Sequence, residues 1–301
     1  MIIFLATMLA TNLGIRLPSV EQKLSVDWRN PNGAEFWVKR DDLIHPIISG
    51  NKWRKLHGAL SRAEQVGITK FVSFGGGYSN HLHALGYVCF QAGWHLNVII
   101  RGDYRANPTP MLQDLHRWGA QIHYVTKATY QRRNDADYVQ HLRQQYPEAM
   151  IIPEGGSSPD ALAGVAEIVY ELTQFYDMLL LPVASGGTLA GLASNPKCPA
   201  LRAIAVLKGE NYLESLVSQS APTSATDWQI LHDFHHGGYA KTSAELMDFV
   251  TDPQISPSIP LESVYSGKLF FAARQLCEAG YFPLNSRILL LHTGGLQGQR
   301  K

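Results

Sequence analysis

The stretch MLLLPVASGGTLAGL, residues 178–192, decides the fold class of this chain. Its first six residues, MLLLPV, are almost wholly apolar, which is typical of a strand buried on both faces of a parallel sheet. The small residues ASGG then turn the chain, and a helix is expected to begin near Thr188. A strand, a turn and a helix in this order make one β-α unit, the building block of α/β proteins.

The same alternation continues along the rest of the chain. Strands are expected over FVSF (71–74), LNVIIRG (96–102), IHYVT (122–126), MIIP (150–153), LRAIAVL (201–207) and RILLLH (287–292). Helices are expected over HLHALGYVCFQAG (81–93), MLQDLHRWGA (111–120), residues 129–146 and PDALAGVAEIVYELTQFY (159–176). This order predicts the α/β class, with mostly parallel sheets covered by helices. Region 218–242 has the weakest periodicity, so we interpret it as a long excursion between core elements.

The composition excludes several classes of protein. The chain has 301 residues, 45% of them hydrophobic and 17% charged, which fits a globular protein of one large domain or two modest ones. A net charge of +1 gives no electrostatic basis for binding nucleic acid or an anionic membrane. Cys89, Cys198 and Cys277 form no C-x-x-C motif, so free thiols in a reducing compartment are expected.

The apolar start MIIFLATMLATNLGIRLPSV (1–20) suggests an export signal, but it lacks a basic beginning and a clear cleavage site. No later apolar run approaches the ~20 residues that a membrane span needs. We therefore expect a cytoplasmic protein. No metal site is expected either, because His292 and the pair His235 and His236 have no partner at metal-ligand spacing.

A lysine follows a second turn, in SGNKWRKL (49–56). Gly50 permits a sharp bend and Asn51 is a plausible N-cap, so Lys52 is predicted in the first turn of a helix. The helix dipole favours a cation at the opposite end, which makes the position unusual for a surface lysine. Taken alone, the basic cluster that Lys52 forms with Arg54 and Lys55 is better explained as a solvated helix face.

The turn after strand 178–183 is a candidate phosphate cup. Backbone N–H groups from Ser185 to Thr188 are expected to converge on one point, helped by the helix dipole. The turn has neither the G-K-[ST] of a Walker loop nor the G-x-G-x-x-G of dinucleotide-binding proteins. Glycine turns after strands are also common without a ligand, so the turn alone leaves both possibilities open.

A third glycine turn lies in FGGGYSNHLHALG (74–86). Ser79, Asn80 and His81 stand at a predicted helix start, where side chains and free backbone N–H groups can hold a carboxylate. The alternative is that Ser79 or Asn80 only caps the helix. The glycine spacing does not match a dinucleotide fingerprint.

Near the end of the chain, RILLLHTGG (287–295) is a predicted buried strand followed by Thr293 at the carboxyl edge of the sheet. Ligands of open α/β sheets bind at that edge. A lysine, a phosphate cup, a carboxylate clamp and a neutral hydroxyl together form the constellation that binds pyridoxal 5′-phosphate (PLP) as a Schiff base.

The motifs, in order, carry a family resemblance. They are KRDDLIHPIISGNKWRKL (39–56), YSNH (78–81), PEGG (153–156), ASGGTLAG (184–191), YSGK (265–268) and HTGG (292–295). Through them nearly the whole chain resembles the 1-aminocyclopropane-1-carboxylate (ACC) deaminase/D-cysteine desulfhydrase family of fold-type II PLP enzymes. The resemblance implies a tryptophan synthase β-like α/β fold, with two open, twisted, mostly parallel sheets in two domains and the cofactor in the cleft. A large PLP-binding domain (1–52 plus 156–301), a small inserted domain (53–155) and a homodimer are implied.

The resemblance also implies residue roles. Lys52 would hold PLP and then act as general base. The other implied roles are phosphate binding by Ser185, Gly186, Gly187 and Thr188, a bond from Asn80 to the ring hydroxyl, a substrate-carboxylate clamp of Ser79, Asn80 and His81, and substrate contacts from Tyr265 and Tyr239.

Two positions separate the branches of the family. Deaminases typically have Y-E-G-K and H-L-G-G, whereas this chain has Ser266 and Thr293 in place of the glutamate and the leucine. A neutral hydroxyl near the pyridine nitrogen leaves that nitrogen less protonated than a carboxylate would, which suffices to expel a thiolate. The expected activity is therefore β-elimination on a D-amino acid, foremost D-cysteine. Tyr78, often Gln in the family, and an end at GLQGQRK (295–301), where relatives continue, are departures close to the implied substrate pocket.

Other interpretations remain open. The nearest alternative is ACC deaminase itself, and serine dehydration or β-replacement are further reactions of the same fold type. A non-catalytic PLP-binding protein would keep Lys52 and the phosphate cup. A sugar-phosphate or nucleotide-binding domain would use the glycine turns without needing Lys52. In every enzymatic case the expected partner is a small-molecule amino acid.

Overall fold

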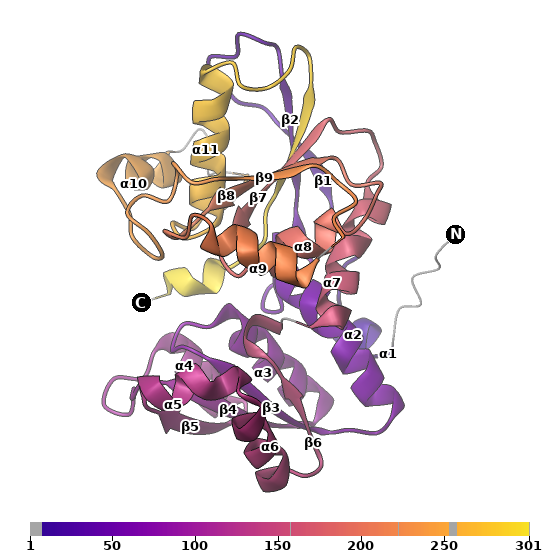
Figure 1. The fold of residues 1–301 in the computed structure, drawn as a ribbon, viewed down its shortest axis with the longest axis vertical. Helices are drawn as coiled ribbons and strands as arrows, with labels where there is room; N and C mark the ends of the chain where they lie inside the picture. The colour runs from indigo at the N-terminus through magenta and orange to yellow at the C-terminus, as the bar shows by residue number, and fades with distance from the viewer. Residues whose placement is uncertain (1–7, 157, 222, 253–257, 301) are drawn as a thin grey trace. The chain divides into compact units, whose positions relative to one another are not determined.

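The computed structural model describes residues 8–156, 158–221, 223–252 and 258–300 (Figure 1). The first seven residues of the apolar start therefore lie outside the described part. Backbone contacts divide the chain into two compact units. Unit 1 comprises Met1–Leu17, Ile44–Gly164 and Gln297–Lys301, and unit 2 comprises Pro18–Leu43 and Val165–Leu296. In this division the boundaries expected at 52/53 and 155/156 both fall inside unit 1.

Unit 1 is built on a four-stranded parallel sheet in the order β5-β4-β3-β6. The strands are β3 (Lys70–Gly75), β4 (His95–Arg101), β5 (Gln121–Val125) and β6 (Ala149–Ile152). The helices are α1 (Met8–Asn12), α2 (Asn51–Gln65), α3 (Asn80–Ala92), α4 (Pro110–Arg117), α5 (Lys127–Gln131) and α6 (Ala136–Gln145), with 3₁₀ turns η2 (Arg132–Asn134) and η3 (Glu154–Gly156). The 3₁₀ turn η5 (Leu296–Gln299) begins at the last residue of unit 2 and continues into unit 1. Buried Leu56, Leu85 and Val98 tie α2 and α3 to β4 in one core.

Unit 2 is built on a six-stranded sheet in the order β1-β2-β10-β7-β8-β9, parallel except for the β1–β2 pair. The strands are β1 (Glu21–Leu24), β2 (Glu35–Lys39), β7 (Met178–Val183), β8 (Ala200–Ala205), β9 (Trp228–Leu231) and β10 (Arg287–Leu291). The helices are α8 (Gly187–Ala193), α9 (Tyr212–Ser220), α10 (Ala244–Thr251) and α11 (Ser266–Glu278), with 3₁₀ turns η1 (Asp41–Leu43) and η4 (Glu167–Glu171). Helix α7 (Pro159–Ala166) crosses the boundary between the units.

The parallel pairing of unit 2 fixes where its loops emerge. Every residue of β7 is buried, as its apolar sequence predicts. Leu290 of β10 pairs with Leu180 of β7, and β7 pairs with β8 in the same direction. Because parallel strands end at the same edge, the ASGG turn after β7 and Thr293 after β10 leave the sheet side by side.

The α/β class and the mostly parallel sheets are confirmed, and four local predictions need correction. The helix expected over 129–146 is broken by η2, and Asp135 then starts α6 in an extended conformation. Within the helix expected over 159–176, only Pro159–Ala166 is α-helical, and the 3₁₀ turn η4 follows it. The excursion 218–242 contains strand β9. Asn51 is the first helical residue of α2 rather than its N-cap, which is Gly50.

Two further sequence features have structural counterparts. The three cysteines are free and buried, as expected from their spacing. Among the described residues, no helix combines the length and the apolar character needed to cross a membrane.

Candidate functional site

The predicted site residues divide between the two units, and each group has its own geometry. Unit 1 carries Lys52 and the YSNH segment, whereas unit 2 carries the ASGGT turn, Tyr239, the YSGK segment and Thr293. Each group is described within its own unit.

Lys52 and Lys55 lie one turn apart at the start of α2, after Gly50 turns the chain with φ 65°. Lys52 is half-buried and Lys55 is 4% exposed. Burial lowers the pKa of Lys52 to about 8, and burial together with the Lys52 charge lowers the pKa of Lys55 to about 7. In the described chain no carboxylate lies within ion-pair distance of either amine. These lysines therefore form an electropositive, partly deprotonated cluster, not the solvated face that the sequence favoured.

His81 is a neutral histidine beside this cluster. The Ser73 hydroxyl donates to Ile152 O (2.8 Å), so it accepts the Nε2–H of His81 at 2.8 Å. Nδ1 of His81 then carries a lone pair, and it is buried without a hydrogen-bond partner among the described residues. Burial, followed by the charges of Lys52 and Lys55, lowers the pKa of His81 to about 3. A neutral ring can accept a hydrogen bond here, but it adds no charge for holding a carboxylate.

The PEGG segment closes on the same cluster. Gly156 has φ 73°, and a Cβ there would lie 3.3 Å from Cβ of Lys55 and 3.5 Å from Nδ1 of His81. Glu154, in the same turn, accepts the Tyr130 hydroxyl at 2.6 Å and pairs with Arg133 at 2.6 Å. Glycine at 156 thus leaves the space beside the two polar groups open, while Glu154 anchors the turn.

Ser79 and Asn80 have different environments at the start of α3. Ser79 is the N-cap and accepts the Leu82 N–H at 3.2 Å, so of the two candidates Ser79 makes the cap. Asn80 Oδ1 accepts a hydrogen bond from Nε2 of Gln297, which also donates to Tyr78 O at 3.4 Å. This bond orients the Asn80 amide so that its NH₂ group points away from Gln297. Gln297 was missed by sequence reasoning because a contact across 217 residues has no local signal.

The ASGGT turn of unit 2 has the backbone form that a ligand cup requires. Gly186 is the N-cap of α8 at φ 76°, and no side chain caps the helix. A Cβ on Gly186 would lie 3.0 Å from Cγ2 of Val217 in α9, so the turn requires glycine. The amides of the first helical turn have no acceptor inside the helix. Ser185 is exposed at the tip of the turn.

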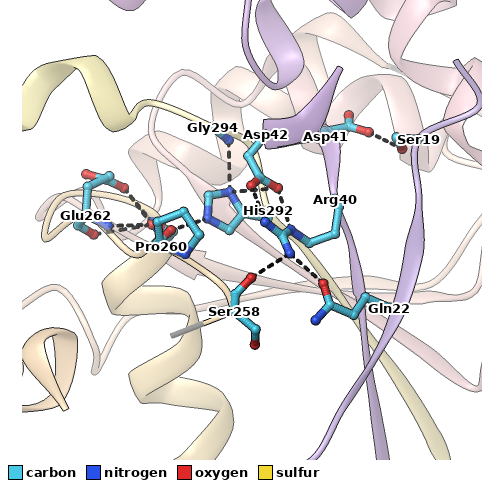
Figure 2. A network of polar contacts seen from close by, with 11 residues as sticks. Ser19, Gln22, Arg40, Asp41, Asp42, Ser258, Pro260, Glu262, His292 and Gly294 are labelled. Atoms are coloured by element: carbon cyan, nitrogen blue, oxygen red, sulfur yellow. Dashed lines mark hydrogen bonds and ion pairs between the residues drawn. The ribbon is translucent and has the colours of Figure 1, made fainter. Parts of the chain in front are cut away.

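His292, which precedes Thr293, makes hydrogen bonds through both of its ring nitrogens (Figure 2). His292 donates Nε2–H to Pro260 O at 2.8 Å, and its Nδ1 accepts the Gly294 N–H at 3.2 Å. The ring therefore fixes both sides of Thr293, which is itself 7% exposed at the end of β10. The interpretation of His292 as a packed, hydrogen-bonded residue is confirmed.

A buried ion pair supports this histidine. Arg40 forms two bonds to Asp42, from Nε at 2.9 Å and from Nη2 at 2.7 Å, and donates to Ser258 O at 2.9 Å. Asp42 Oδ1 lies 3.7 Å from Nδ1 of His292. Figure 2 shows these groups meeting around the imidazole ring. The His292 ring is thus anchored at Pro260 and Gly294, and the Arg40–Asp42 pair lies beside it.

Glu262 organises the YSGK segment. Its carboxylate is 3% exposed and accepts the N–H groups of Val264 (2.7 Å), Tyr265 (2.7 Å) and Ser266 (2.6 Å). The Ser266 hydroxyl donates to the same carboxylate at 3.1 Å and accepts the Glu262 N–H at 2.9 Å. Burial raises the pKa of Glu262, and these hydrogen bonds oppose the rise. The donor of Ser266 is therefore spent inside the protein.

The two tyrosines lie together in unit 2. The Tyr239 and Tyr265 hydroxyls are 3.0 Å apart, and their rings are 6.2 Å apart at 72°. Burial and the neighbouring Tyr239 raise the pKa of Tyr265 well above its ordinary value, so it remains a phenol. The two hydroxyl groups can donate or accept hydrogen bonds.

These residues fit PLP on structural grounds. The cofactor needs an amine that can lose its proton, and burial makes this easier for Lys52 by lowering its pKa to about 8. Its phosphate is suited to the start of a helix that has no side-chain cap, and the glycine turn before α8 has that form.

Comparison with known proteins gives the same family. The family model for pyridoxal-phosphate-dependent enzymes matches residues 25–294. A putative 1-aminocyclopropane-1-carboxylate deaminase of Pyrococcus horikoshii is 27% identical over 282 residues, which cover 88% of this chain and 86% of that protein. The mitochondrial bifunctional D-cysteine desulfhydrase/1-aminocyclopropane-1-carboxylate deaminase of Arabidopsis thaliana is 27% identical over 296 residues, covering 89% of this chain and 74% of that protein.

A solved structure agrees with the sequence matches. The crystal structure of an ACC deaminase homologue superimposes with a TM-score of 0.77 at 26% identity, covering 95% of this chain and 92% of that one. The match of the family model over most of the chain, together with the lysine cluster and the uncapped glycine turn, leads to one conclusion: the chain belongs to the pyridoxal-phosphate-dependent enzymes.

Proposed function

We propose that this enzyme catalyses β-elimination on a D-amino acid, with D-cysteine as the substrate. D-cysteine and water give pyruvate, hydrogen sulfide and ammonia. The Cα–H and Cβ–S bonds break, sulfur leaves with the electrons of the C–S bond, and water finally replaces nitrogen at Cα. A homodimer, implied by the family resemblance, and a cytoplasmic location are part of the same proposal.

The residues of the chain divide this work. PLP, when bound, supplies an aldehyde for the substrate amine and an electron sink for the Cα–H bond. Lys52 is proposed as the anchoring amine and as the base that takes the Cα proton, which its lowered pKa of about 8 favours. Ser185, Gly186, Gly187 and Thr188 would hold the phosphate. Ser79, Asn80 and the neutral His81 would orient the substrate carboxylate, and Tyr239 and Tyr265 would contact the substrate.

The observation that carries the choice of D-cysteine is the hydroxyl of Thr293 at the carboxyl end of β10, next to the turn after β7. We propose that this neutral group, rather than a carboxylate, faces the pyridine nitrogen. Ser266 supports that role less directly, because its hydroxyl already donates to Glu262. A neutral partner leaves the nitrogen largely unprotonated, which suits expulsion of a good leaving group such as thiolate.

ACC deamination is the second candidate, because the Arabidopsis thaliana relative carries both activities in its name. In that reaction ACC and water give α-ketobutyrate and ammonia. Glu262 is the carboxylate nearest to position 266, and its Oε1 reaches the Ser266 hydroxyl. If the Glu262 carboxylate acts through Ser266 to keep the pyridine nitrogen of PLP protonated, the ring becomes a stronger electron sink and opening of the cyclopropane becomes possible.

A product assay separates the two reactions. We expect pyruvate and sulfide from D-cysteine, and little α-ketobutyrate from ACC. The same screen would include L-cysteine, D-serine and β-chloroalanine. Higher kcat/KM for ACC than for D-cysteine would contradict the proposal.

The anchoring role has a spectroscopic test. Purified Lys52→Ala should lose the visible absorbance of covalently held PLP, while Lys127→Ala, at an exposed lysine of the same unit, should keep it. An unchanged visible spectrum in Lys52→Ala would remove Lys52 from this role.

A further inference from the structure

Lys268 is a fully buried cation that the proposed mechanism leaves unused. It lies in the first turn of α11 with 0% exposure. Lysine is rarely buried unless its charge is compensated. Its Nζ donates to Val206 O at 3.1 Å, to His235 O at 2.8 Å and to Gly238 O at 2.8 Å. The three hydrogens of the ammonium are all spent on backbone carbonyls.

Two of these carbonyls belong to a strained loop. Between residues 236 and 240 the backbone has positive φ at four positions, namely His236 (49°), Gly237 (93°), Gly238 (122°) and Ala240 (53°). Positive φ costs free energy at His236 and Ala240, because their side chains crowd the backbone there. Such a conformation persists only when surrounding contacts hold it.

The strained loop carries Tyr239. This tyrosine is 55% exposed, yet its hydroxyl lies 3.0 Å from that of Tyr265. Tyr265 stands three residues before Lys268 at the same end of α11. Lys268 therefore ties three parts of unit 2 together: the end of β8 at Val206, the loop that carries Tyr239, and the helix start that carries Tyr265.

We propose that Lys268 is a positioning residue, whose ammonium holds the loop 235–240 in the conformation that presents Tyr239 beside Tyr265. Its consequence for catalysis rests on the proposed function, in which both tyrosines contact the substrate. The geometric part of the proposal does not depend on the identity of the reaction. Lys268 acts through Tyr239 and needs no contact with the substrate.

The first test measures the loop itself by hydrogen–deuterium exchange of the PLP-loaded enzyme. Lys268→Met keeps the length of the side chain and removes the donors, so exchange in peptides covering 235–241 should rise. Lys241→Met, at an exposed lysine in the same loop, is the matched control and should leave exchange unchanged. Unchanged loop exchange in Lys268→Met, or an equal rise throughout unit 2, would overturn the proposal.

The second test uses D-cysteine turnover. Lys268→Met should lower kcat/KM about 100-fold, as expected when a reacting group is misplaced by about 1 Å. In a Tyr239→Phe background the same change should cost less than about threefold, because the group that Lys268 positions is already gone. Full additivity of the two losses would indicate a general structural role and contradict the proposal.

A third variant covers the case in which Lys268→Met folds poorly. Ala240→Gly relieves the positive φ, so the double variant Ala240→Gly/Lys268→Met should recover part of the lost loop protection and part of kcat/KM. No recovery in a folded double variant would mean that Lys268 does not act on this loop. If the wild type turns over none of the substrates, the proposed function fails, while the exchange experiment still decides the role of Lys268.

Discussion

Two turns in this protein share one sequence pattern and meet their hydrogen-bond needs in opposite ways. In unit 1, FGGGYSNH leads from β3 to α3, and Ser79 caps the helix by accepting the Leu82 N–H. In unit 2, VASGGT leads from β7 to α8, and the N-cap is Gly186, which has no side chain to offer. A side-chain cap satisfies one of the free N–H groups at a helix start, whereas a helix start without such a cap leaves that group to water or a ligand.

The glycines serve different purposes in the two turns. A Cβ on Gly75 would lie 2.6 Å from the Leu82 side chain, and one on Gly77 would lie 2.6 Å from the Tyr104 ring. These glycines let protein pack against protein. Gly186 instead supplies a left-handed backbone at φ 76°, which turns the chain from β7 into α8. Equal glycine content thus does not imply equal function.

The largest expected effect comes from replacing Gly186, because its turn depends on a left-handed glycine. Gly186→Ala forces a left-handed alanine whose Cβ lies 3.0 Å from Cγ2 of Val217. We expect the affinity for PLP, measured by titration of the apo-protein, to fall about 100-fold. A loss of this size corresponds to one or two charge-assisted hydrogen bonds from backbone amides. Gly93→Ala, also at positive φ but with open space around it, should destabilise the fold by about 1 kcal/mol and leave affinity unchanged.

Replacing Ser79 tests whether the capped turn has a second role. Ser79→Ala should cost about 1 kcal/mol of unfolding free energy through loss of the cap, and about 10-fold in kcat/KM if the side chain also orients the substrate. Thr126→Ala removes a comparable cap from α5, since Thr126 accepts the Thr129 N–H at 3.1 Å. Both variants should show similar thermal shifts. Equal kcat/KM in the two would restrict Ser79 to capping.

The lysine cluster gives the most gradual effect, a pH dependence of the stability of the apo-protein. The folded pKa of Lys55, about 7, lies below its unfolded value, so the unfolded state binds more protons between about pH 7 and pH 10. Stability of the wild type should therefore rise with pH across that window, and the penalty should be greatest below pH 7. Urea unfolding of Lys55→Met should show a weaker rise. Identical slopes for both proteins would mean that Lys55 is not desolvated in the apo-protein.

Local sequence predicted the elements with a strong apolar pattern and failed where polar contacts decide. The buried strands β7 and β10 were found from their apolar runs alone. The break between α5 and α6 was missed, because a polar helix has no apolar face whose interruption could be noticed. The change from α-helix to the 3₁₀ helix η4 after Ala166 was also missed. At the end of η4, Glu171 pairs with buried Lys39 at 3.1 Å, and this partner is 132 positions away in the sequence.

By itself, the sequence determined the β-α order, the glycine turns and the constellation of lysine, hydroxyls and small residues, because apolar periodicity and backbone freedom are local properties. Tertiary structure alone decided that Lys55 is buried, that the Ser266 hydroxyl is spent on Glu262, and that Lys268 holds the loop of Tyr239. Charge and hydrogen-bond partners come from segments distant in sequence. Burial, which sets the protonation of an amine, exists only once those segments have packed.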